Sequence, residues 1–231
     1  MEPGDAMTQR VYARVAGFAY LWLIVTGMAS MVTISRITGS GTFLERARNV
    51  AASERLYRVA LSCGLIETLS AVLLAFALYV TLKPVNRLLA QIAMFWRLGE
   101  SFTGGVGVVF GFVLLHLYTA PQAGAGVSQA LVGLTREGSY VAGNVSAIFF
   151  SVGSLLFSYL FYKSRYIPRA LAALSLVASL IVPIVCFGTL IFPEHAGALQ
   201  YGWAPMALAE IGIGFWLMIF AVPADAAGLA R

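Results

Sequence analysis

Residues 57–82 read YRVALSCGLIETLSAVLLAFALYVTL and contain only two charged side chains, those of Arg58 and Glu67. About 20 mostly apolar residues suffice for an α-helix to cross the hydrocarbon core of a bilayer. A chain in that core finds no water for its backbone groups, and an α-helix satisfies them internally. This segment therefore predicts a membrane-spanning helix.

Five further segments of the chain share this length and apolar character. Hydrophobic residues make up 60% of the sequence and charged residues 11%, whereas about 25% of a soluble domain is charged. We therefore predict an all-α integral membrane fold, a bundle of about six transmembrane helices that forms a single transmembrane domain over residues 1–231. The predicted spans are residues 15–35, 57–82, 86–115, 140–162, 170–192 and 202–222.

The loop after the first span carries its own helix signal. Thr42 and Glu45 have the spacing of a capping box, in which the side chain of each residue accepts a hydrogen bond from the backbone N–H of the other. Apolar Phe43, Leu44 and Val50 share the following segment with arginines, a composition suited to the membrane surface. We predict a short interfacial helix over residues 43–52 in this first external loop.

Basic residues indicate how the bundle is oriented. They gather in the loops after the second and fourth spans, namely Lys83, Arg87, Lys163, Arg165 and Arg169. Short loops rich in Lys and Arg stay in the cytoplasm, which predicts an N-in/C-in protein. Arg136 is then expected in an external loop. The first external loop departs from the rule because it also carries arginines, among them Arg46 and Arg48.

Composition also excludes several classes of protein. The net charge of +5 is spread over these loops, which suits contact with anionic membrane lipids and forms no nucleic-acid-binding stripe. Cys63 and Cys186 lie in apolar runs, where thiols act as small apolar groups, so no disulfide is predicted. His116 and His195 are expected at the outer surface and form no metal-ligand pattern. No motif indicates a cofactor.

Four ionisable residues lie inside predicted spans: Glu67, Arg97, Glu100 and Glu210. Charged groups are costly in a bilayer, so each is a candidate for function. At about 1.5 Å per residue, the glutamates lie roughly 20–24 Å from the cytoplasmic ends of their helices, and we expect them to converge as a catalytic set. Arg97 should neutralise Glu100 one turn away, and at least one glutamate should stay protonated. Alternatively, these groups only form structural hydrogen bonds between helices.

Small and polar residues line two of the predicted spans. Glu100 is followed on one helical face by three glycines, Gly104, Gly107 and Gly111. Such a face allows a neighbouring helix to approach closely. The fourth span carries a stripe that includes Asn144 and Ser151, and Trp216 follows Glu210 in the sixth. We expect Asn144, Ser151 and Trp216 to contact a substrate.

Several segments resemble a known family. They are ARVAGFAY (residues 13–20), LKPVNR (82–87), FWRLGE (95–100), YIPR (166–169) and the segment from Glu210 to Trp216. With these segments the chain resembles, over nearly its whole length, the bacterial domain-of-unknown-function family 4386. The resemblance implies a six-helix protein of the bacterial cytoplasmic (inner) membrane, and no activity comes with it.

Three functions fit these features. The first is an enzyme that acts on a lipid-like or isoprenoid substrate by carboxylate acid–base chemistry, by analogy with integral-membrane terpene cyclases. The second is a proton- or cation-coupled transporter that uses the same glutamates. The third is a non-catalytic membrane partner or sensor. The expected partners are membrane lipids and a lipophilic small molecule; the sequence predicts no cofactor and does not define the oligomeric state.

Overall fold

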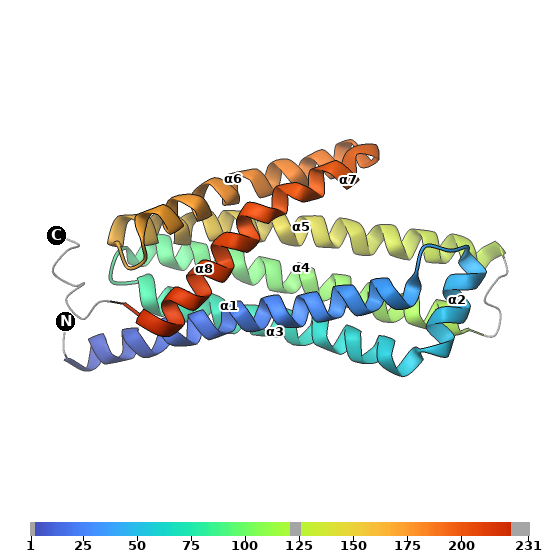
Figure 1. Ribbon diagram of the computed structural model, residues 1–231, viewed down its shortest axis with the longest axis horizontal. Helices are drawn as coiled ribbons and strands as arrows, with labels where there is room; N and C mark the ends of the chain where they lie inside the picture. The colour runs from blue at the N-terminus through green and yellow to red at the C-terminus, as the bar shows by residue number, and fades with distance from the viewer. Residues whose placement is uncertain (1–2, 121–125, 223–231) are drawn as a thin grey trace.

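The computed structural model describes residues 3–120 and 126–222 as a helical bundle (Figure 1). Its main helices are α1 (Pro3–Thr38), α2 (Phe43–Ala52), α3 (Glu54–Leu82), α4 (Arg87–Thr119), α5 (Gly126–Ser164), α6 (Arg169–Ile191) and α8 (Ala204–Phe220). Three short turns join α6 to α8, namely η1 (Pro193–His195), α7 (Ala196–Leu199) and η2 (Gln200–Trp203). Within the described residues, six helical segments are long and apolar enough to cross a membrane, and there is no strand. The predicted fold class is confirmed.

Four helices, α1, α3, α4 and α5, extend beyond the predicted spans, whereas α8 is shorter than its predicted span of residues 202–222. α5 begins at Gly126 and not near residue 140, and α4 continues to Thr119. Arg136 therefore lies within a helix and not in a loop. A hydropathy pattern marks where a helix leaves the lipid, but a helix can continue into water because its backbone bonds remain satisfied. With 39 residues, α5 is about 58 Å long, about twice the thickness of the hydrocarbon core.

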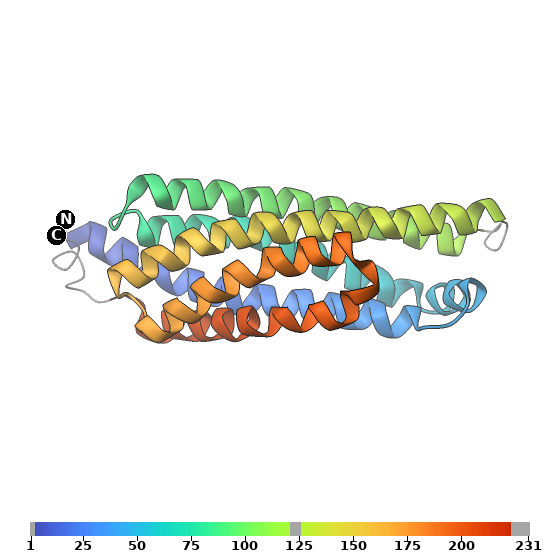
Figure 2. The ribbon, with the colours of Figure 1, turned by 90° about the horizontal axis from the view of Figure 1, so that it is seen from above.

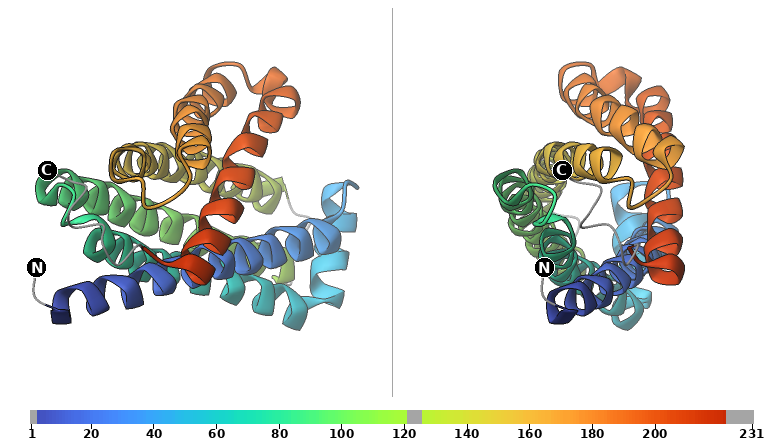
Figure 3. Two further views of the ribbon diagram at one scale, coloured as in Figure 1. Left: turned by 60° about the vertical axis from the view of Figure 1, so that its left-hand side comes forward. Right: turned by 90° about the vertical axis from the view of Figure 1, so that its left-hand side faces the viewer.

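The spanning helices form a ring in chain order. Each of α1, α3, α4, α5, α6 and α8 packs against the next, and α8 packs against α1. Figure 3 shows this arrangement from one end. We call the end that carries Lys83 and Arg169 the Lys83 end, and the opposite one the α2 end. α1 begins and α8 ends at the Lys83 end (Figure 1).

The ring is closed most tightly in its Lys83 half. α1 and α8 cross there, and a Cβ atom on Gly17 would lie 2.6 Å from the backbone oxygen of Gly214. Large apolar side chains fill the interior, and Leu78, Phe157 and Leu217 are at most 1% exposed. This packed layer separates the middle of the bundle from the Lys83 end.

Polar groups hold the Lys83 end together. The Gln9 amide nitrogen donates to the backbone oxygen of Thr81 over 2.7 Å and to the Tyr166 hydroxyl over 3.1 Å. The indole N–H of Trp216 donates to the backbone oxygen of Tyr166 over 3.2 Å. These bonds join α1, α3, α8 and the loop between α5 and α6.

Towards the α2 end, α6 and α8 stop short of the other helices. Figure 2 shows α4 and α5 running on together beyond the turn that joins α6 to α8. The ring of six helices therefore becomes, beyond this turn, a group formed by α1, α3, α4 and α5. The cavities described below lie where this change takes place.

Helix α2 covers the end of that group. Its capping box is confirmed, because the Glu45 N–H donates to the Thr42 hydroxyl over 3.4 Å and the Thr42 N–H donates to the Glu45 carboxylate over 2.7 Å. The bond from the Thr42 N–H, with a second one from the Thr42 hydroxyl to the same carboxylate, holds the pKa of the Glu45 carboxyl below its usual range. Val50 is fully buried in a cluster with Tyr57 and Leu115, so α2 packs on the bundle by its apolar face.

Candidate functional site

The four ionisable residues inside the predicted spans lie around one cavity. Its volume is about 510 Å³, and its walls come from α1, α3, α4, α5, α8 and η2. Glu67, Arg97, Glu100 and Glu210 all line it. We call this space the acid-lined cavity.

Arg97 is held in place by groups from two helices. Its side chain is 2% exposed, and Nε lies 3.0 Å from Oε2 of Glu100. The angle does not fit a hydrogen bond, so this contact is an ion pair. Nη1 donates to the Ser154 hydroxyl over 3.2 Å, and the guanidinium carbon lies 4.6 Å from the ring centre of Phe150. A buried cation needs such partners, because leaving water is costly for an unpaired charge.

The space for Arg97 depends on a glycine. A Cβ atom on Gly153 would lie 2.8 Å from Cγ and 3.0 Å from Cδ of Arg97, and 3.1 Å from the backbone oxygen of Ala93. The absence of a side chain at this position lets α5 approach α4 with the arginine stem between them. Gly153, Ser154 and Phe150 thus form the seat of Arg97.

The carboxyl groups of Glu67 and Glu210 differ from that of Glu100. Within the described residues, neither forms a hydrogen bond or an ion pair within 4 Å. Their charges still act on Arg97 through space. Glu67 lies against α1, where a Cβ atom on Gly27 would be 3.2 Å from its carboxyl carbon. These acids have free oxygen atoms in the cavity and can bind a cation or transfer a proton.

Aromatic side chains line the same cavity. Tyr20, Phe150 and Trp203 come from α1, α5 and η2. The ring centres of Phe150 and Trp203 are 6.1 Å apart. The sequence did not single out these residues, because aromatic residues are common in spanning helices and nothing in their spacing marks an inward face.

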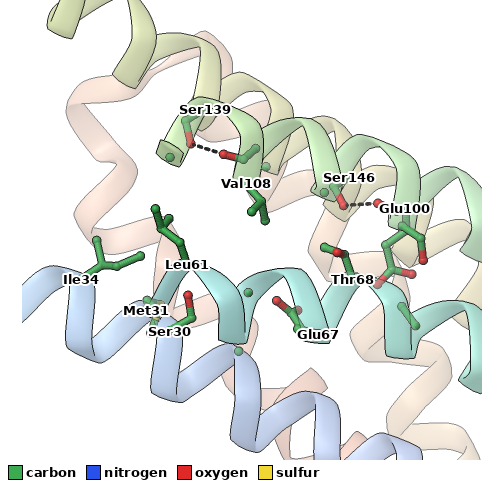
Figure 4. Close-up of a pocket in the computed structure, with 18 of the residues that line it drawn as sticks. Ser30, Met31, Ile34, Leu61, Glu67, Thr68, Glu100, Val108, Ser139 and Ser146 are labelled. Carbon is green, nitrogen blue, oxygen red and sulfur yellow. Dashed lines mark hydrogen bonds between the residues drawn. The ribbon is translucent and has the colours of Figure 1, made fainter. Parts of the chain in front are cut away.

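A second cavity of about 470 Å³ continues from the acids towards the α2 end, between α1, α3, α4 and α5 (Figure 4). We call it the groove. Small residues line much of it, namely Gly27, Ser30, Gly64, Thr68, Ser101, Gly104, Gly107, Gly111, Ser139, Gly143 and Ser146. Two hydrogen bonds join its α4 and α5 walls: Ser146 donates to the backbone oxygen of Glu100 over 2.9 Å, and Ser139 to that of Gly107 over 3.5 Å (Figure 4).

The glycine face of α4 therefore has two roles. A Cβ atom on Gly111 would lie 2.5 Å from Leu61, so this glycine allows α3 to approach closely. A Cβ atom on Gly107 would meet nothing nearer than the backbone oxygen of Ser139 at 4.0 Å. Gly107 leaves open space in the groove, whereas Gly111 serves the helix packing that the sequence predicts.

The three expected substrate contacts lie elsewhere. Asn144 accepts a hydrogen bond from Thr189 of α6 over 3.0 Å, and Ser151 is buried and donates to a backbone oxygen of its own helix. Trp216 binds the Tyr166 carbonyl near the Lys83 end. None of the three lines the acid-lined cavity or the groove. Asn144 belongs to the face of α5 that packs on α6, whereas Ser146 and Phe150 line the cavities.

No metal site is evident in residues 3–120 and 126–222, which hold no group of three His, Cys, Asp or Glu side chains arranged for an ion. The two cysteines, Cys63 and Cys186, are both free thiols.

The fold and composition define a polytopic α-helical membrane protein. Within that class, the profile of a family described as a domain of unknown function, DUF4386, matches residues 15–221. The chain belongs to this family, as the resemblance of its segments predicts. No curated protein matches the chain, and no solved structure matches it.

Proposed function

We propose that this protein is an acid–base enzyme that acts on a lipophilic substrate with a carbon–carbon double bond or an epoxide, such as an isoprenoid. The observation that carries the proposal is the pair of unpartnered carboxyl groups, Glu67 and Glu210, in a cavity with aromatic walls. Acid and base chemistry needs two such groups in different protonation states.

The reaction follows from these groups. One carboxylic acid donates its proton to an alkene carbon, so that the π electron pair forms the new C–H bond and the neighbouring carbon becomes cationic. The other carboxylate stabilises this cation, together with the aromatic side chains of Tyr20 and Trp203 that line the cavity. It then removes a proton from an adjacent carbon, and that C–H electron pair forms a new double bond. These steps amount to an isomerisation that consumes no oxidant or reductant. If a second double bond of the substrate first attacks the cation, its π electron pair forms a C–C bond and leaves a new cation, and the same proton loss completes a cyclisation.

Arg97 and Glu100 have a supporting role in this proposal. Glu100 pairs with Arg97, so Glu67 and Glu210 remain for acid–base chemistry. The surroundings of these two acids differ, because Glu67 lies against α1 and Glu210 belongs to α8. Unequal surroundings favour one protonated and one ionised carboxyl.

A proton- or cation-coupled transporter is the second candidate, supported by the same free carboxyl groups. With the Lys83 end in the cytoplasm of a bacterial cell, as its basic residues favour, the acids lie in the outer half of the inner membrane.

Transfer of a solvent-derived deuteron tests the enzyme even while its substrate is unidentified. The protein is incubated in D₂O with bacterial membrane lipid extract in nanodiscs, and the lipids are examined by mass spectrometry. We expect C–D bonds in a lipophilic product, and a loss of about 10²–10⁴-fold in their rate of formation in Glu67→Gln or Glu210→Gln.

The control variant is Glu54→Gln, which removes an acid that pairs with Arg58 near the α2 end and lines neither cavity. It should keep the wild-type rate. Absence of deuterium from every lipid, or equal labelling by all variants, would overturn the enzyme. Cation flux into vesicles that disappears in the same two glutamine variants would support the transporter in its place.

A further inference from the structure

We infer that the groove and the acid-lined cavity form one site for a single-chain amphiphile, whose positively charged end lies between Glu67 and Glu210 and whose chain lies in the groove. The inference deepens the proposed function by naming the shape and charge of the ligand. It concerns binding and does not depend on turnover.

The two cavities adjoin each other. They share six lining residues, namely Gly27, Met31, Glu67, Glu100, Gly143 and Ser146. Figure 4 shows Glu67 and Glu100 on facing helices at one end of the groove and Ile34 and Leu61 towards the other. A molecule that reaches the carboxyl groups can therefore extend along the groove.

The length and volume of the groove suit a hydrocarbon chain. From Glu67 to Tyr57, which also lines it, α3 rises about 15 Å. Glycines and serines on the four walls keep its width open, and apolar side chains such as Leu61 and Val108 provide contact surface. A space of about 470 Å³ with this length suits one hydrocarbon chain.

A buried hydroxyl in the groove lacks a partner. Ser101 is 7% exposed and lines the groove, and its oxygen forms no hydrogen bond with any described residue. An unsatisfied buried hydroxyl is unfavourable. The Ser101 oxygen can accept a hydrogen bond from the N–H of a ligand's ammonium group, and it lines the groove together with Glu100.

The charge balance selects the sign of the ligand. Glu100 neutralises Arg97, and the remaining acids, Glu67 and Glu210, have no cationic partner within 4 Å in the described residues. The aromatic side chains of Tyr20 and Trp203, which also line the cavity, add an attraction for cations. A primary alkylammonium group carries this charge at neutral pH. The cationic intermediate of the proposed reaction carries it transiently, so both can be recognised by the same acids.

The test compares two tritiated probes of equal chain length, dodecylammonium and dodecyl sulfate, by saturable binding to the full chain in phosphatidylcholine nanodiscs. We expect the ammonium probe to bind at least about tenfold more tightly. The double variant Glu67→Gln/Glu210→Gln, which removes the ionised carboxyl whichever of the two it is, should weaken ammonium binding by about tenfold or more. Glu54→Gln should bind like the wild type.

Gly107→Leu fills the groove and should weaken both probes, while Val109→Leu, on the exposed surface of the same helix, should weaken neither. Circular dichroism establishes that each variant is folded. Equal binding of the two probes, or ammonium binding that survives both glutamine substitutions, would overturn the inference. Ammonium binding without deuterium transfer would support the inferred binding site and contradict the proposed enzyme. Deuterium transfer without a preference for the ammonium probe would support the enzyme and contradict the inferred binding site.

Discussion

The guanidinium of Arg97 lies among the Glu100 carboxylate, the Ser154 hydroxyl and the Phe150 ring. Each contact replaces part of the hydration that the cation loses on burial. Removal of one partner from a buried ion pair is costly, about 3–5 kcal/mol, because the other charge stays behind. We therefore expect Arg97 to determine both the stability of the bundle and the position of its acids.

Gly153→Ala tests this seat without changing a charge. The new methyl group would overlap the Arg97 stem and press on the Ala93 carbonyl. We expect the free energy of unfolding in detergent to fall by about 1–3 kcal/mol, as for other overpacked sites. Gly105→Ala is the matched control, because its Cβ atom would meet nothing within 4 Å. Equal stability of the two variants would mean that Arg97 does not occupy this seat.

Among single residues, the sequence identified the ionisable members of the site but not the aromatic residues that line it. Glu67 and Glu210 stand out as ionisable residues in apolar runs, and helix rise places them at similar depths. Tyr20 and Trp203 have no such signal. Asn144 was expected at the site because it belongs to a polar stripe, but which neighbour a stripe faces depends on how α5 is rotated against α6, and local spacing does not contain that information.

The helices divide into two sets by length. α4 and α5 extend well beyond α6 and α8, so the bundle changes at mid-height from a ring to a group covered by α2. The sequence predicted each spanning helix because long apolar runs leave no alternative in lipid. It placed the start of α5 too late because charged Arg136 and Glu137 end the apolar run without ending the helix.

The capping box makes the order of α2 depend on pH. Glu45 has a lowered pKa because the Thr42 N–H and hydroxyl bind its carboxylate. A group whose pKa is lower in the folded state contributes stability above its unfolded pKa of about 4.3 and loses it as the pH falls through the folded value. We expect amide hydrogen exchange in α2, corrected for its intrinsic rate, to accelerate below about pH 4.

Glu45→Gln is the control for α2, because the amide can still accept the bond but cannot titrate over this range. Its exchange should not change with pH in this way. The same acceleration in both chains would show that another group controls the end of α2.

The whole molecule combines a packed Lys83 half with an open half towards α2. Orientation decides which side of the membrane a ligand comes from. The order of the helices around the ring could not be predicted from the sequence, because spans of similar hydrophobicity fit several arrangements. Small residues at helix crossings, such as Gly17 and Gly214, favour the observed arrangement, but this becomes evident only when the helices have been placed.

Cysteine labelling measures this orientation. In a chain whose Cys63 and Cys186 are replaced by alanine, a membrane-impermeant maleimide added to intact cells should label Arg48→Cys and not Lys83→Cys, because basic loops stay in the cytoplasm. Both positions are exposed, so both should react after permeabilisation. Labelling of Lys83→Cys alone in intact cells would invert the topology.

An experimental structure in nanodiscs that contain bacterial membrane lipids tests the central claim most directly. The claim is that Glu67 and Glu210 meet in a cavity that holds a lipophilic ligand. We expect elongated density in the groove that ends between these two carboxyl groups, and we expect it to be lost in Gly107→Leu. Carboxyl groups that lie on opposite sides of the bundle, or a groove filled by protein side chains, would contradict the claim.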